Sequence, residues 1–213
     1  MRLTQPKCTP LRKLFRNKVR PLTDFRGDMT TLIARQAQLI ETNVRWLRQA
    51  RTLLELMDDF SFTASPKGME PHRVSGHFRH ILEFYECFLE GVESGYVDYD
   101  GRRRDSSLER SRAAAIHKID DIINRLQTTR ELSGDAAVFV RMEDIDPGEF
   151  QDPSLFSSVS RELQVLSSHT IHHFALIAMT LRAHGCDIDR DFGVAPSTLR
   201  YHSEKAASRA EAA

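Results

Sequence analysis

Apolar residues recur at three- and four-residue steps over long stretches of this chain, and this spacing most constrains its fold. From residue 29 to 58, leucine, isoleucine and tryptophan side chains return at this interval, with arginine and glutamine between them. Similar spacing runs over residues 75–93, 106–129 and 153–183. A period near 3.6 is typical of an amphipathic α-helix with one buried face. The sequence therefore predicts four long helices.

Residues that stop or start helices support these boundaries. The segment SFTASPKGMEPH, rich in turn formers, separates the first two helices. Ser106 with Glu109 matches a capping box that opens the third helix, and Asp152 before Pro153 matches the start of the fourth. Between the last two helices, residues 133–150 are expected to form a long connection, which could include a short strand because valine and phenylalanine favour extended structure.

Four long helices without a convincing sheet predict an all-α fold, a four-helix bundle over residues 29–186. Residues 1–28 are basic, with no acid before Asp24, and are expected to form a flexible tail. The same stretch also fits an upstream extension ahead of Met29, or a basic targeting or membrane-surface arm. Residues 187–213 are polar and are expected to cross the surface and then fray.

Composition narrows the class of protein. The chain has 213 residues, enough for a single core, and its 30 basic and 30 acidic residues cancel. A balanced charge argues against a specific nucleic-acid partner, and no apolar run approaches the ~20 residues of a membrane span. The three cysteines are odd in number and widely spaced, which fits a reducing cytosol and a cytoplasmic location. Any metal ion would be held mainly by histidine.

The segment SSHTIHHFALIAMTL in the fourth predicted helix carries the strongest chemical signal. His169 and His173 are four residues apart, so on a helix they share one face and could bind one ion together. Leu166, Ile177 and Thr180 occupy the same face, which is therefore expected to point inward. A buried imidazole needs a polar partner, and a metal ion would supply one.

A second histidine pair lies in the second predicted helix, in SGHFRHILEFYECF. His77 and His80 are three residues apart on its apolar side, and either could complete a three-histidine site with open positions. His172 is adjacent to the HxxxH pair and is an alternative ligand on spacing alone. The competing interpretation is a set of hydrogen-bonded core or surface histidines that bind no metal.

The segments GHFRHILEFYECFLEG and SRELQVLSSHTIHHFALI resemble the DinB-like superfamily, which includes YfiT-type metal-dependent hydrolases. The resemblance covers about residues 30–184 and implies a four-helix bundle with one histidine ligand on its second helix and an HxxxH pair on its fourth. It places the ligands at His80, His169 and His173. Many members continue with Arg-Gly-Gln, where this chain has Phe174, Ala175 and Leu176.

The resemblance implies a divalent metal, zinc or nickel, and often a homodimer. The superfamily includes thiol-dependent transferases and isomerases, so the implied activity is that of a metal-dependent transferase or hydrolase acting on a small molecule, with a thiol-bearing substrate as one option. A non-catalytic metal-binding or dimerisation module, tied to a stress response, is the alternative. A bundle that binds DNA through its basic tail and the arginine loop at residues 102–104 is a third and weaker interpretation, because the net charge is zero and the sequence lacks a recognition motif.

Residues outside the histidines offer fewer candidates for chemistry. In the loop VDYDGRRRD, Arg102, Arg103 and Arg104 could clamp an anionic substrate group and Tyr99 could add a donor, although a surface ion-pair network is the favoured interpretation. Glu83 or Glu162 could act as a base or orient a ligand histidine, and Cys87 is expected to be a packed thiol.

Overall fold

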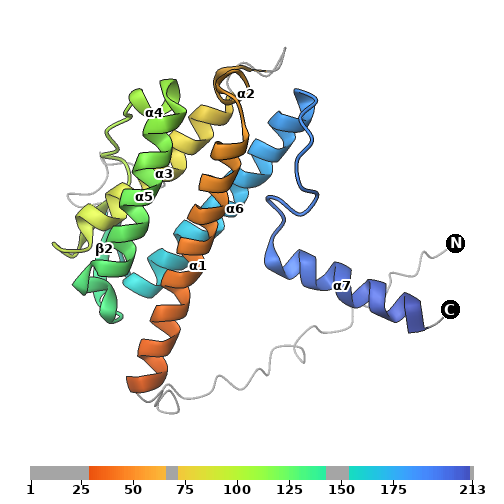
Figure 1. Cartoon of the computed structure of the whole chain (residues 1–213). Helices are drawn as coiled ribbons and strands as arrows, with labels where there is room; N and C mark the ends of the chain where they lie inside the picture. Colours follow the sequence, from red (N-terminus) through yellow and green to blue (C-terminus); the bar gives the residue numbers. More distant parts are fainter. Residues whose placement is uncertain (1–28, 66–71, 143–153, 212–213) are drawn as a thin grey trace, which may run out of the picture.

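The computed structural model describes residues 29–65, 72–142 and 154–211, and the described chain is mostly helical. Its long helices are α1 (Met29–Leu56), α3 (Val74–Gly91), α5 (Arg112–Thr128) and α6 (Val159–Ala183). Helix α1 packs against α5 and α6, and α3 packs against the same two helices (Figure 1). The four helices predicted from periodicity therefore surround one shared core.

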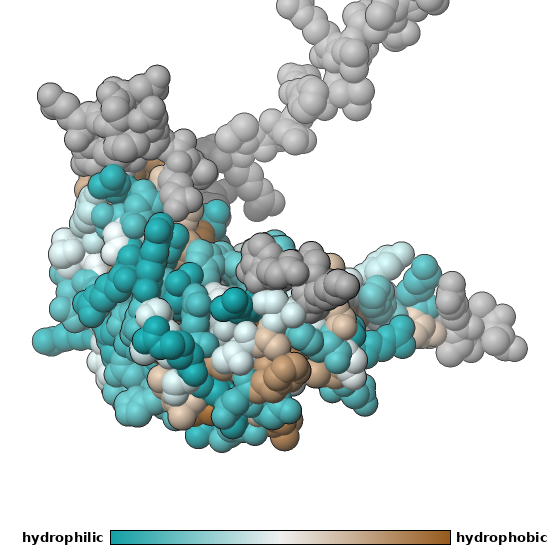
Figure 2. Space-filling view, turned by 90° about the horizontal axis from the view of Figure 1, so that it is seen from above, coloured by the Kyte–Doolittle hydropathy of each residue, from teal (hydrophilic) through white to brown (hydrophobic). Residues whose placement is uncertain are grey.

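The core is built from the apolar faces of these helices. Their fully buried side chains include Leu47, Leu54, Phe78, Phe88, Ile119, Leu163 and Phe174. Viewed from above, most of the molecular surface is hydrophilic, with the hydrophobic colour confined to small areas (Figure 2). Within the described residues, no helix is both long enough and apolar enough to cross a membrane.

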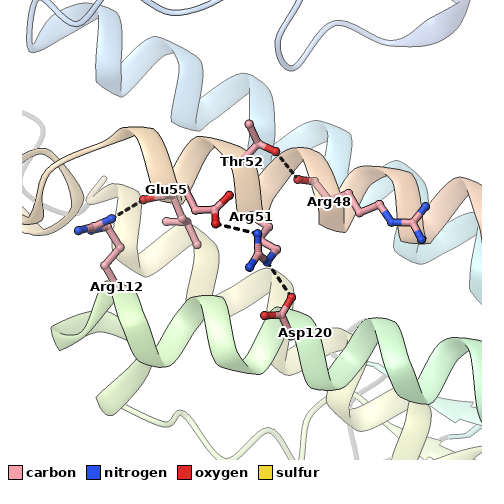
Figure 3. Close-up of polar contacts among 7 residues, drawn as sticks. Arg48, Arg51, Thr52, Glu55, Arg112 and Asp120 are labelled. Atoms are coloured by element: carbon pink, nitrogen blue, oxygen red, sulfur yellow. Dashed lines mark hydrogen bonds and ion pairs between the residues drawn. The ribbon is translucent and has the colours of Figure 1, made fainter.

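Polar contacts on the outer surface tie α1 to α5. Arg51 binds the carboxylate of Asp120 at 2.8 Å and that of Glu55 at 2.7 Å (Figure 3). Arg112, the first residue of α5, donates to the carbonyl oxygen of Leu54 at 2.7 Å. Because these groups are exposed or half-buried, they add modestly to the stability that the apolar core provides.

A three-stranded sheet departs from the expected all-α fold. Strands β1 (Tyr96–Asp98), β2 (Ala137–Arg141) and β3 (Leu155–Ser158) lie in that order, with β1 and β2 parallel and β2 and β3 antiparallel. Strand β2 confirms the short strand expected within residues 133–150. The sheet buries Val97 and Val138, and a row formed by Tyr96, Phe139 and Phe156 is exposed.

The third predicted helix is divided. Helix α4 (Ser107–Arg110) is followed by Ser111, whose extended backbone, with φ −130° and ψ 110°, separates it from α5. The side chain of Ser111 accepts a hydrogen bond from the Ala114 amide and caps α5. The predicted capping box is wrong because the Ser106 side chain makes no cap hydrogen bond and Glu109 pairs with Arg79.

The fourth helix starts later than residue 153. Residues Leu155–Ser158 pair with β2 as a strand, and the Ser158 side chain then caps α6 by accepting from the Arg161 amide. The predicted start at Asp152 and Pro153 lies outside the described residues. Pairing with β2 therefore overrides the helical pattern over the first part of this segment.

The two predicted tails have different outcomes. Residues 1–28 lie outside the described residues. The segment 187–213 was expected to be a fraying surface strip, but it contains helix α7 (Pro196–Glu211), which lies apart from the four long helices (Figure 1). Before it, buried Phe192 stacks on Phe174 with ring centroids 4.8 Å apart. The short helices α2 (Asp59–Thr63) and η3 (Arg130–Ser133) complete the described fold.

Candidate metal centre

Three histidine side chains meet between α3 and α6. His80 comes from α3, and His169 and His173 lie one turn apart on α6. The Nε2 atom of His169 is 3.1 Å from Nε2 of His80 and 3.1 Å from Nε2 of His173. The three residues form a group whose potential ligand atoms all lie within 4.8 Å of one another. The packing of α3 against α6 therefore brings together histidines that the sequence predicts on two separate helices.

The two contacts at His169 cannot both be ordinary hydrogen bonds. An Nε2 atom carries either one hydrogen or one lone pair, directed in the ring plane, so it makes one strong hydrogen bond. The Nε2 of His169 has two neighbours of the same kind at 3.1 Å. A cation bound to all three lone pairs would satisfy every one of these atoms at once.

The spacing of the nitrogens also fits such an ion. Zinc binds imidazole nitrogen at about 2.0–2.1 Å, which gives a nitrogen–nitrogen separation of about 3.3 Å for tetrahedral ligands and about 2.9 Å for ligands at right angles. The two separations of 3.1 Å lie between these values. The residues present therefore fit a three-histidine divalent-metal site.

His77 contacts this cluster as a neighbour of one ligand. Its Nδ1 atom lies 3.1 Å from Nδ1 of His173. If Nε2 of His173 binds a metal, its Nδ1 carries the hydrogen and can donate it to His77. A hydrogen bond of this kind orients metal-ligand histidines in many proteins. The geometry thus favours His80 over His77 as the third ligand, and it leaves His172 exposed, with its ring 5.2 Å from that of His173.

Burial keeps the two α6 imidazoles neutral. Desolvation, followed by the charge of neighbouring histidines, lowers the pKa of His169 to about 3 and that of His173 to about 2. Desolvation also lowers the pKa of His77. A neutral imidazole has the free lone pair that a metal ion requires, so at physiological pH the cluster is in the form that binds metal.

Aromatic rings form one wall of the centre. Phe84 stacks on His169 with centroids 4.1 Å apart and meets the edge of His80 at 4.7 Å. Tyr99 stacks on Phe84 from β1's C-terminal end, and the guanidinium of Arg102 lies 4.7 Å from the Phe84 ring centroid. These rings fix the imidazole orientations and keep water from this side of the histidines.

The predicted substrate-binding residues do not converge on the histidines. Tyr99 is fully buried, and its hydroxyl donates to Glu162 at 2.9 Å instead of facing a cleft. Of the three arginines, Arg102 lies nearest the site, across Phe84. Arg103 pairs with Glu90 at 2.7 Å, as the surface ion-pair interpretation expects, and Arg104 is exposed.

The other titratable candidates have structural partners. Glu83 is buried and accepts a hydrogen bond from the Asp105 amide at 2.6 Å. Glu162 accepts from Tyr99 and from Ser157. Cys87 is half-buried, and desolvation raises its pKa to about 11, which keeps the thiol protonated at neutral pH. These groups brace the fold around the site.

Three charged residues that were not predicted from the sequence lie beside the histidine cluster. Arg73, Arg79 and Glu109 line an open cleft together with His77, His80 and His173. Arg73 precedes the second histidine pair in the sequence and Arg79 lies within it, but periodicity alone does not indicate that they face the same cleft. Glu109 reaches it because α4 packs against α3.

Comparison with known proteins gives one partial similarity. No family model and no solved structure matches the chain. Over 105 residues, or 49% of its length, the chain is 33% identical to FK506-binding protein 5 of Rhizopus delemar. The match spans 27% of the fungal protein. A similarity over so small a part of that protein assigns neither a family nor an activity to this chain.

Proposed function

We propose that this chain binds one zinc or nickel ion through His80, His169 and His173 and acts as a metal-dependent transferase or hydrolase of the DinB-like type. The observation that carries the proposal is the pair of 3.1 Å contacts at His169 Nε2, which hydrogen bonding alone cannot satisfy. The neutral state of the α6 imidazoles and the donor–acceptor contact with His77 support it.

The open cleft supports a catalytic role over a purely structural one. Structural zinc sites are closed by four protein ligands, whereas catalytic sites keep a position for water or substrate. His80 and His173 line the cleft, and the group of potential ligands in the described chain contains three residues. A divalent ion held there would lower the pKa of a water molecule or of a substrate thiol, which would make either a nucleophile at neutral pH.

A non-catalytic metal-binding module is the second candidate function. It is favoured by the ion pair between Glu109 and Arg79 at 2.9 Å, because this pair engages the acid that lines the cleft. A general base must lie within hydrogen-bond reach of the proton that it accepts, and this ion pair holds the Glu109 carboxylate against Arg79.

Metal content tests the proposal. Mass spectrometry of the purified protein, after incubation with zinc or nickel, should find close to one ion per chain in the wild type and little in His80→Ala or His169→Ala. His117→Ala is the matched control, because that histidine is exposed on α5 and should leave the metal content unchanged. A wild-type protein that holds no metal would contradict the proposal and leave these histidines as a structural cluster.

A further inference from the structure

The open cleft beside the histidine cluster has a chemical character of its own. It has a volume of about 470 Å³. Two arginines and one glutamate line it together with three histidines and a glycine: Arg73, Gly76, His77, Arg79, His80, Glu109 and His173. The cleft therefore combines an edge of the proposed metal site with an excess of positive side chains.

The two arginines differ in how their charge is compensated. Arg79 lies 2.9 Å from a carboxylate oxygen of Glu109 and 3.8 Å from one of Glu83. Arg73 is exposed, and its Nε donates to the hydroxyl of Ser65 at 3.2 Å. A hydroxyl carries no charge, and no ion pair with Arg73 occurs among residues 29–65, 72–142 and 154–211, so within this part of the chain its positive charge is not compensated. Arg73 is thus the cation in the cleft that is best placed to attract an anion.

The backbone leaves room for a ligand next to Arg73. Gly76 lines the cleft, and a Cβ built on it would meet no atom of the described residues within 4 Å, apart from its chain neighbours and the backbone of its own helix. Arg73 and Gly76 also mark the first turn of α3, an 18-residue helix whose amino end carries a partial positive charge. A bound divalent ion would add two further positive charges at the histidine edge of the same cleft.

We propose that this cleft binds the oxyanion group, a carboxylate or a phosphate, of a small molecule whose other end lies against the metal site. Arg73 supplies the main contact, because a guanidinium offers paired donors that match the oxygens of either group. The inference rests on the proposed function for the metal. It assigns anion recognition to Arg73 and leaves Arg103, which is paired with Glu90, outside the site.

Calorimetric titration of the zinc-loaded full chain with sulfate, a stand-in for either oxyanion, tests the proposal at constant ionic strength. Loss of a charged hydrogen-bond donor should weaken sulfate binding about tenfold or more in Arg73→Gln. Arg103→Gln, which removes the same charge from an exposed site, should bind as the wild type does. Equal affinity in the two variants, or no sulfate binding in the wild type, would overturn the proposal.

A second variant removes space instead of charge. Gly76→Leu places a side chain in the open part of the cleft, and leucine is a better helix former than glycine, so the fold should be retained. Sulfate binding should be lost while the zinc content stays at the wild-type level. Sulfate affinity that is unchanged in a folded Gly76→Leu protein would also contradict the assignment.

Titration of the metal-free protein separates this inference from the proposed function. Binding that depends on Arg73 in a protein that takes up no zinc would refute the metal proposal and keep the anion cleft. Zinc uptake together with sulfate binding that Arg73→Gln does not weaken would support the metal proposal and refute the anion cleft. Parallel titrations of the metal-free protein with acetate and inorganic phosphate then show which oxyanion the cleft prefers.

Discussion

At the scale of single residues, the account depends on how many bonds one imidazole nitrogen can make. The shared face of His169 and His173 could be predicted from the sequence, because helix geometry places residues four apart on one side. Which of His77 and His80 is the third ligand could not be predicted, since both lie on the apolar side of the same helix. It depends on ring orientation, which packing against Phe84 and His173 determines.

Replacement of His77 tests its role beside the ligands. His77→Ala removes the acceptor for the Nδ1 hydrogen of His173, so metal affinity should fall about ten- to a hundredfold while binding is retained. Competition with a chromogenic chelator would measure this. His172→Ala, the exposed neighbour, is the control and should change little. Complete loss of metal in His77→Ala would instead make His77 a ligand.

Acid should destabilise the metal-free protein through the same histidines. Burial lowers the pKa of His169 to about 3 and of His173 to about 2, whereas in the unfolded chain both titrate near 6.5. Between these values the unfolded chain binds protons that the folded chain does not, so the free energy of unfolding should decrease as the pH falls below about 6.5. Urea unfolding at a series of pH values would show it, and a double His169→Ala, His173→Ala variant should have the flatter profile.

At the scale of elements, the sequence predicted the bodies of the helices better than their ends. Periodicity reports a buried face, and it located α1, α3, α5 and α6. The break at Ser111 and the strand before α6 depend on partners elsewhere in the chain: α4 packs on α3, and β3 pairs with β2. A local sequence pattern such as the Ser106–Glu109 spacing contains no information about those distant partners.

One element contact gives a stability prediction. Gly91 ends α3 directly against β1, and an added Cβ would lie 2.5 Å from the Tyr96 carbonyl oxygen and 2.7 Å from the Val97 Cα. Gly91→Ala should therefore lower the free energy of unfolding by about 1–3 kcal/mol through backbone displacement. Gly76→Ala in the same helix, where the added atom meets open space, should cause no loss. Equal stabilities of the two variants in urea would contradict this packing.

At the scale of the whole molecule, the sequence predicted a helical chain with one core and a histidine site between helices. It missed the sheet, because β1 and β2 are parallel strands about forty residues apart and each is too short to show a period. The cleft could not be predicted either, since Glu109 lines it together with Arg73 only because α4 packs against α3. The DinB-like assignment of the bundle stays a prediction.

X-ray absorption at the metal edge of the zinc-loaded protein tests the central claim most directly. The account predicts three imidazole nitrogens at about 2.0–2.1 Å with the remaining ligand an oxygen, and no sulfur. It also predicts loss of this imidazole signature in His80→Ala. A sulfur ligand, or a spectrum that His80→Ala leaves unchanged, would show that zinc binds elsewhere and would contradict a metal centre built from His80, His169 and His173.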